Sequence, residues 1–559
     1  MQRDMVSDPF SFTPLNFNEF QDGYGSIQED HAVFQGEHGF SAILRGMDTL
    51  PTAEEQNQQD DFNFDHFMLE EFNFEPVPQP KQLCQETREP KNKQVLPSSL
   101  ASLELLSSYG RWFKRVEKQN ISRSVETSVS PQKLSTEEIV RLAGARYIQH
   151  STTQWLDDAC IPMHPYGFGF GILSEEEYRD VELAQFLLAA AERVGCQQFV
   201  RASMLLFHLQ WNPSGGGGSP VQRVVFHFAQ ALLERIRRET GGGKVALDEC
   251  ENKNQERELV EKLKSDTNMA LICHQKIPFN QVMQFAGVQA IVEHVAFQTK
   301  IHFINLDIGC GVKCTTLMQA LAERNERQVE LLKITTIGLK GKTELEKTGK
   351  RLVSFAESLN LPFLYKVVFV KSIVEIKVEQ FDVEDDEAVA VYCPNVLRTM
   401  VSDSDSLEHL MRVMRKIRPT IMIVLELEAN HNSPSFVNRF IEALFFYAAY
   451  FDCIETCMKQ DYECRMRIEG ILSEGIRNIV ALEDGERKVR NVKIDVWRRF
   501  FARYRMVETT FSESSLYQAN LVAKRFEYGN FCTVDKKGKC LIVGWRGTPI
   551  HSISAWKFL

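Results

Sequence analysis

The 559-residue sequence has no long apolar run, no excess of positive charge and no regular cysteine framework. No stretch approaches the roughly 18 uninterrupted apolar residues of a membrane-spanning helix, and the N-terminus shows no apolar signal segment. We therefore expect a chain that is neither membrane-bound nor secreted. The net charge of −10 argues against a surface built mainly to neutralise nucleic-acid phosphates.

The 13 cysteines are odd in number and scattered, which favours reduced thiols in cytosol or nucleus over a disulfide scaffold. The tightest group is Cys453, Cys457 and Cys464. It has neither the spacing of a tetrahedral zinc site nor a nearby histidine, so we expect no metal.

The common catalytic motifs are also missing from the sequence: there is no Gly-x-Ser-x-Gly elbow, no phosphate loop and no His-Glu-x-x-His. The most reactive cluster lies in residues 424–436 and contains Glu426, Glu428, Asn430 and His431. These groups could do acid–base chemistry or fix a loop. We expect the structural role, with Ser433 capping a helix that starts at Pro434.

Up to about residue 130 the chain is rich in Gln, Asn, Ser, Pro and acids and has little periodicity, so we expect it to be largely disordered. Residues 60–76 interleave six acids with five aromatic residues, and no Lys or Arg occurs in residues 46–80. The five are Phe62, Phe64, Phe67, Phe72 and Phe74. This pattern is typical of an activation or docking segment, and the alternative is an acidic linker with chance aromatics.

Residues 135–295 show mainly helical periodicity, with apolar stripes in residues 174–195 and 224–243. Stripes so rich in Leu and Ala pack in a core or carry a partner interface. The partner-binding candidates are Leu183, Phe186, Leu187, Phe228 and Leu232.

From about residue 296 the pattern changes to short runs that are apolar on both faces and alternate with helix-length segments. The runs begin near residues 301, 331, 364, 388, 420 and 539. This alternation predicts βαβ units: an α/β, Rossmann-like, mostly parallel sheet with helices on both faces. Ligands of such sheets bind at the carboxyl ends of the strands.

One strand end carries a glycine turn, "FINLDIGCG" at residues 303–311, followed by a helix expected to begin at Thr315. Asp307, Gly309 and Gly311 resemble the acid-x-Gly-x-Gly turn of methyltransferases that bind S-adenosylmethionine. However, Lys313 stands where a third glycine belongs, and the next strand end offers no carboxylate before Glu344 to hold the ribose. Glycines also serve tight turns that bind nothing. The three residues are weak cofactor candidates, and we expect no cofactor and no catalytic residue.

Taken in order, several blocks resemble the plant GRAS family of transcriptional regulators over residues 175–559. Residues 179–195 and 226–236 resemble its first leucine-rich region, 301–308 its VHIID signature with His302 and Asp307 kept, and 425–452 a further family block. Residues 486–501 and 541–558 resemble its C-terminal motifs, ending in Ser554, Ala555 and Trp556. Trp497, Trp545 and Trp556 suit buried anchors whose single N–H needs one partner, or a partner contact.

The resemblance is nearest the DELLA-like branch, but the Asp-Glu-Leu-Leu-Ala motif is absent from residues 1–130, which argues against binding of a gibberellin receptor. It implies a GRAS domain over 131–559, with an α-helical cap mainly in 135–295 and an α/β core mainly in 296–559. The resemblance also implies a protein of the nucleus, and also of the cytoplasm, that regulates transcription by binding transcription factors and other GRAS proteins. Such a protein would form homo- or heterodimers, would contact DNA only indirectly and would have no enzymatic activity.

Two alternatives remain open on the sequence. One is a methyltransferase that uses S-adenosylmethionine. The other is a factor that binds a specific DNA sequence directly through Arg498, Arg499, Arg503 and Arg505, although "WRRFFARYR" contains no recognised reading motif and equally fits a solvated helix face.

Overall fold

The computed structural model describes residues 133–153, 173–209, 217–241, 267–325 and 327–559. The predicted disordered region and its acidic-aromatic segment at residues 60–76 lie outside this part of the chain. Among the described residues, no helix is both long and apolar enough to cross a bilayer.

The N-terminal part of the described chain, up to His294, is helical. Its helices are α4 (Thr136–Thr153), α5 (Glu175–Gly195), α6 (Phe199–Leu209), α7 (Pro220–Glu239), α9 (Thr267–Lys276) and α10 (Pro278–His294). Capping boxes begin α5 at Ser174 and α7 at Ser219, where each serine accepts from the backbone of the third helical residue. Both helix starts are therefore fixed by local sequence.

Strands and helices then alternate. The strands are β1 (Lys300–Asn305), β2 (Leu331–Gly338), β3 (Phe363–Phe369), β4 (Ala388–Pro394), β5 (Ile421–Leu427), β6 (Met506–Thr509), β7 (Cys532–Lys537), β8 (Cys540–Trp545) and β9 (Thr548–Phe558). The helices between them are α11 (Val312–Ala322), α12 (Lys342–Ser358), α13 (Ser404–Ile417), α14 (Phe436–Cys457), α15 (Tyr462–Val480), α16 (Ile494–Arg503) and α17 (Glu513–Arg525).

The sheet runs in the order β3-β2-β1-β4-β5-β9-β8-β7, and β6 pairs with β9 beside this path. Strands β1 to β5 are parallel, and β9, β8 and β7 join antiparallel. One face of the sheet is covered by α10, α11, α12 and α17, and the other by α13 and α16. Each face packs on its helices through a separate apolar cluster. The predicted Rossmann-like α/β architecture with helices on both faces is confirmed.

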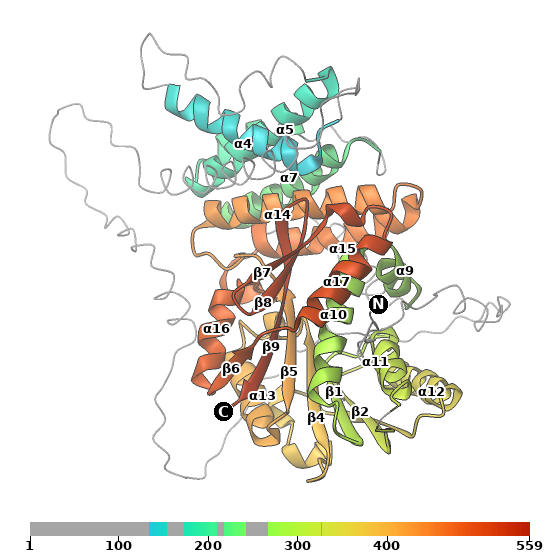
Figure 1. The fold of residues 1–559 in the computed structure, drawn as a ribbon. Coiled ribbons are helices and arrows are strands. Elements are labelled where there is room, and N and C mark those ends of the chain that lie inside the picture. The colour runs from blue at the N-terminus through green and yellow to red at the C-terminus, as the bar shows by residue number, and fades with distance from the viewer. Residues whose placement is uncertain (1–132, 154–172, 210–216, 242–266, 326) are drawn as a thin grey trace, which may run out of the picture.

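A helical layer lies above one end of the sheet (Figure 1). It contains α4 to α7, and α14 packs against α4, α5 and α7 while α15 packs against α7 and α14. Helix α10 instead lies on the sheet, against β5, β8, β9 and α17. The layer is therefore assembled from segments of both halves of the chain.

Asp452 on α14 joins the helical layer to the last strands. Its carboxylate accepts from the backbone N–H of Thr136 at 3.1 Å, from the indole N–H of Trp545 at 2.7 Å and from the guanidinium of Arg546 at 2.8 Å. Because a buried carboxylate needs such donors, this residue fixes the start of α4 against the β8–β9 turn.

Two helix starts differ from the sequence-based expectation. Helix α11 begins at Val312 and not at Thr315, because Gly311 adopts a left-handed conformation and reverses the chain there. Helix α14 begins at Phe436, and its capping side chain is Ser435, not Ser433.

Candidate functional site

The order of the parallel strands reverses between β1 and β4, which is where open α/β sheets bind ligands. The glycine turn follows β1 at this point. Gly309 has φ +53° and Gly311 has φ +82°, values that favour glycine. The turn therefore has the backbone shape of a nucleotide-binding loop.

Two N–H groups of this turn, those of Gly309 and Gly311, are used inside the turn itself. The N–H of Gly311 donates to the carbonyl of Ile308 at 3.0 Å. The N–H of Gly309 donates to the carboxylate of the half-buried Asp307, and loss of solvent around this carboxyl raises its pKa above the usual value. Two of the donors that would face a ligand phosphate or carboxylate in a binding loop are thus satisfied by the chain.

Helix α12 occupies the outer side of the turn. The Thr348 hydroxyl donates to the carbonyl of Gly309 at 3.1 Å, and the Arg351 guanidinium donates to the carbonyl of Cys310 at 3.3 Å. A Cβ at Gly311 would lie 2.9 Å from the Thr348 methyl group. The close approach of α12 requires glycine here without any ligand.

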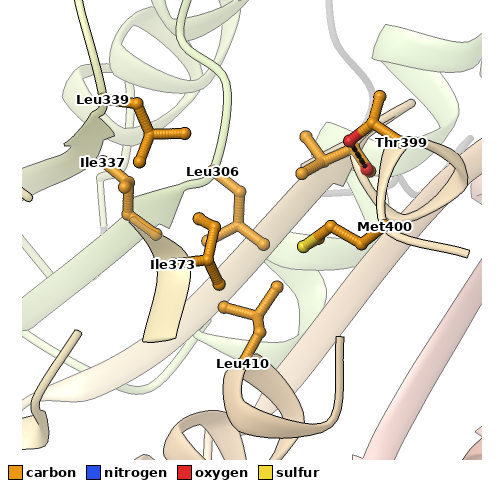
Figure 2. Close-up of a pocket in the computed structure, with 8 residues that line it drawn as sticks. Leu306, Ile337, Leu339, Ile373, Thr399, Met400 and Leu410 are labelled. Atoms are coloured by element: carbon orange, nitrogen blue, oxygen red, sulfur yellow. Dashed lines mark hydrogen bonds between the residues drawn. The ribbon is translucent and has the colours of Figure 1, made fainter. Parts of the chain in front are cut away.

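Apolar side chains converge beside the turn, at the carboxyl ends of β1, β2 and β4 (Figure 2). The cavity that remains has a volume of about 10 Å³, close to the roughly 10–15 Å³ that a single water needs. Its lining consists of Leu306, Ile337, Leu339, Ile373, Val396, Thr399, Met400 and Leu410. Leu339 directly follows β2, where a ribose-binding acid would be expected. The residues present do not fit S-adenosylmethionine.

Lys313 adds an unfavourable charge at the same place. It is half-buried in the first turn of α11, and its charge acts on Asp307 and on the buried His551, helping to lower the pKa of this imidazole to about 3. S-adenosylmethionine carries a positive sulfonium, so a partly desolvated ammonium nearby disfavours the cofactor.

The polar cluster after β5 is tied to different elements. The buried Glu426 carboxylate accepts from the N–H of Arg398 at 3.2 Å and caps the short 3-10 helix at Leu397–Thr399. Burial raises its pKa to about 7. His431 accepts from the Asn491 amide at 2.9 Å and stacks on the Tyr447 ring, and burial lowers its pKa to about 3.

Of the structural-motif residues, His302 lies in β1 with no exposed surface, 2.8 Å from the Thr335 hydroxyl and 3.2 Å from the Glu387 carboxylate. Trp497, Trp545 and Trp556 are all buried, and the last two donate to Asp452 and to Ser554 at 2.7 and 2.8 Å. Asn430 is half-buried, with its amide oxygen unpartnered among the described residues. Trp497 and Trp556 share one apolar cluster, in which both pack against the Phe501 ring.

The partner-binding candidates lie mostly inside the helical layer. Leu187, Phe228 and Leu232 are buried, Leu183 is half-buried, and Phe186 is exposed. Phe228 packs edge-on against the Phe440 ring of α14 at 5.2 Å. Of these five, Phe186 alone is placed to meet another protein without a rearrangement.

Three large apolar side chains face solvent on one side of α6, a helix that the sequence reasoning did not single out. Val200, Met204 and Phe207 are 72%, 65% and 73% exposed and follow each other at i, i+4 and i+7. We call these three residues the α6 face. The opposite side of α6 buries Ala202, Leu206 and Leu209 against its neighbours. A helix that is apolar on two opposite sides is the signal that could have identified it.

The four arginine candidates for DNA contact differ in accessibility. Arg498 is half-buried and binds Glu508 at 2.9 Å, Asp495 at 2.7 Å and the carbonyl of Lys537 at 2.6 Å. Arg499, Arg503 and Arg505 lie nearer the surface. Arg498 is therefore part of the fold and is not free to read a base.

No group of three or more potential metal-binding side chains comes together among the described residues, Cys453, Cys457 and Cys464 included.

Comparison with known proteins gives one consistent family. A model of the GRAS domain family matches residues 183–557, about two-thirds of the chain. The DELLA protein RGL1 of Arabidopsis thaliana is 28% identical over 387 residues, covering 69% of this chain and 72% of that protein. Scarecrow-like protein 18 of the same plant is 28% identical over 407 residues, covering 67% of this chain and 91% of that protein.

Among solved structures, SCL7 of Oryza sativa matches with a TM-score of 0.57 and 24% identity, covering 67% of this chain and 99% of that one. At this identity the likeness shows a shared fold.

Proposed function

The chain belongs to the GRAS domain family, as its motifs had indicated, and from this premise we propose that it is a nuclear regulator of transcription in a plant that acts by binding other proteins. The proposed partners are a second GRAS domain or a transcription factor. DNA contact in this scheme is indirect, through the partner.

The α6 face is the observation that carries this proposal. Three large apolar side chains on one helix side are exposed by about two-thirds or more, and covering them would contribute roughly 3–6 kcal/mol of gross hydrophobic free energy. Association entropy offsets about as much. The face therefore suits the centre of a larger interface. Its i, i+4 and i+7 spacing fits packing against the apolar side of a partner helix.

The state of the cofactor crevice supports a role without catalysis. Two N–H groups of the glycine turn are bonded within the turn, α12 bonds two of its carbonyls, apolar side chains fill the space next to it, and Lys313 adds an unfavourable charge. A methyltransferase needs an open site for both cofactor and substrate. The geometry around the turn therefore argues against the methyltransferase alternative.

A reporter assay tests the proposal. The full chain is fused to a heterologous DNA-binding domain in plant protoplasts, and reporter output is compared with that of the DNA-binding domain alone. We expect a change in output that the variant V200S/M204S/F207S abolishes. Because these side chains are exposed, each substitution should change stability by only about 0.5 kcal/mol or less.

Phe297→Ser is the matched control, because Phe297 is also 73% exposed but lies after α10. It should leave reporter output unchanged. If the triple variant accumulates in nuclei and keeps the full effect, docking through the α6 face is wrong.

A further inference from the structure

The α6 face has no cover among the described residues, although the other side of the same helix is fully packed. The buried side chains of α6 have the same spacing as the exposed ones but lie two residues, or about 200°, further around the helix. The buried ones are Ala202, Leu206 and Leu209, and the exposed ones are Val200, Met204 and Phe207. A helix that is apolar on both sides is normally covered on both. Something is therefore expected to cover this face between encounters with a partner.

Residues 60–76 of the same chain have complementary chemistry. They contain five phenylalanines and six acids, and no Lys or Arg occurs in residues 46–80. Helix α6 contains no acid, and its Arg201 is exposed beside the apolar face. An acidic, aromatic segment can therefore cover the face without like-charge repulsion and with a favourable contact to Arg201.

The connection between the two is long enough. Residues 77–132 lead to the start of α4, α4 packs on α5 and α5 packs on α6. With the disorder that the composition of residues 77–132 predicts, their end-to-end distance would be roughly 40 Å, while α5, with 21 residues, is roughly 30 Å long. The tether gives an effective concentration on the order of 1 mM, so even a contact with a Kd of about 100 μM would be about 90% formed.

We propose that residues 60–76 dock on the α6 face of their own chain and cover it until a partner displaces them. This inference rests on the proposed function, since it assigns to the partner-docking face its intramolecular competitor.

Photo-cross-linking in the full-length protein tests the contact. With p-benzoylphenylalanine in place of Phe207, irradiation should give an intramolecular adduct that peptide mass spectrometry maps to residues 60–76. Replacement of all five phenylalanines by alanine should lower the adduct yield by roughly tenfold, because the contact would then be mostly open. The same probe in place of Phe297 should give no adduct with residues 60–76.

An adduct that maps to residues 154–172, a cross-linked pair of chains, or a yield that the five-alanine variant leaves unchanged would each overturn the inference. The reporter assay separates it from the proposed function. If V200S/M204S/F207S abolishes reporter output while no adduct maps to residues 60–76, the proposed function stands and the inference fails. If the adduct maps there but the triple variant keeps its output, the intramolecular contact stands and the proposed function fails.

Discussion

Gly309 and Gly311 belong to one turn but have different reasons to be glycine. Both have positive φ. An added Cβ at Gly309 would meet nothing within 4 Å, whereas at Gly311 it would press on Thr348 and Leu352 of α12. The sequence suggested a cofactor because a tight strand-to-helix turn and a cofactor-binding loop share the same glycine spacing. The contact with α12, 37 residues further along the chain, distinguishes them, and no local pattern reports it.

Substitution of the two glycines should separate the cost of a left-handed backbone from the cost of a steric clash with α12. Gly309→Ala should cost about 1 kcal/mol, the usual penalty of a left-handed residue. Gly311→Ala should cost about 2–4 kcal/mol, because the new methyl group also displaces the 2.9 Å neighbour Thr348. Urea unfolding measures both, and equal losses would show that α12 does not constrain the turn.

Glu426 should give stability a measurable pH dependence. Burial raises its pKa from 4.5 to about 7, so between these pH values the folded chain holds a proton that the unfolded chain releases. The stability from the neutral carboxyl is fully present below pH 4.5 and is lost as pH rises to about 7.

Glutamine cannot ionise, so Glu426→Gln should gain about 3 kcal/mol relative to the native chain between about pH 4.5 and pH 7.5. The measurement is the difference in unfolding free energy between the two proteins across this range. If the unfolding free energies of the two proteins change with pH in parallel, Glu426 ionises freely in the folded state.

At the scale of elements, α6 departs from the rest of the helical layer. Helices α5 and α7 bury their apolar stripes against each other and α14, while α6 buries one stripe and exposes another. The exposed stripe accounts for the many apolar side chains on a short helix of 11 residues.

Substitutions at two neighbouring residues of α6 should differ sharply in their effect on the free energy of unfolding. Leu206→Ala removes a fully buried side chain and should cost about 2–5 kcal/mol, depending on how far the site collapses. Phe207→Ala removes a larger side chain that is 73% exposed and should cost no more than about 1.5 kcal/mol, the release of the docked segment included. A large loss for Phe207→Ala would mean that its ring is packed in solution.

The elements differ in how well the sequence predicts them. Strands β1 to β5 and β8 were expected, because continuous apolar runs between helix-length segments are typical of buried strands in a parallel sheet. The packing of α14 against α4, α5 and α7 was not foreseen, since those contacts join residues roughly 200 or more positions apart. The candidates Leu187, Phe228 and Leu232 were chosen by the same stripe that buries them, and only the structure shows which side faces solvent.

At the scale of the whole molecule, one architecture carries two surfaces with opposite properties. The crevice at the sheet's switch point is filled by leucine, isoleucine and methionine side chains, while the helical layer exposes apolar side chains on α6. An enzyme of this architecture needs an open crevice for its ligands. The filled crevice and the exposed apolar side chains of α6 are the two observations on which the proposed docking role rests.

Titration calorimetry of the full chain with S-adenosylmethionine tests this central claim most directly, with a methyltransferase of known affinity as the positive control. A working methyltransferase would bind at micromolar levels, on the order of −8 kcal/mol. The filled crevice, the packing of α12 on the turn and Lys313 predict no saturable heat at ligand concentrations up to about 1 mM, where binding would be weaker than about −4 kcal/mol. A saturable isotherm in the micromolar range would contradict the account.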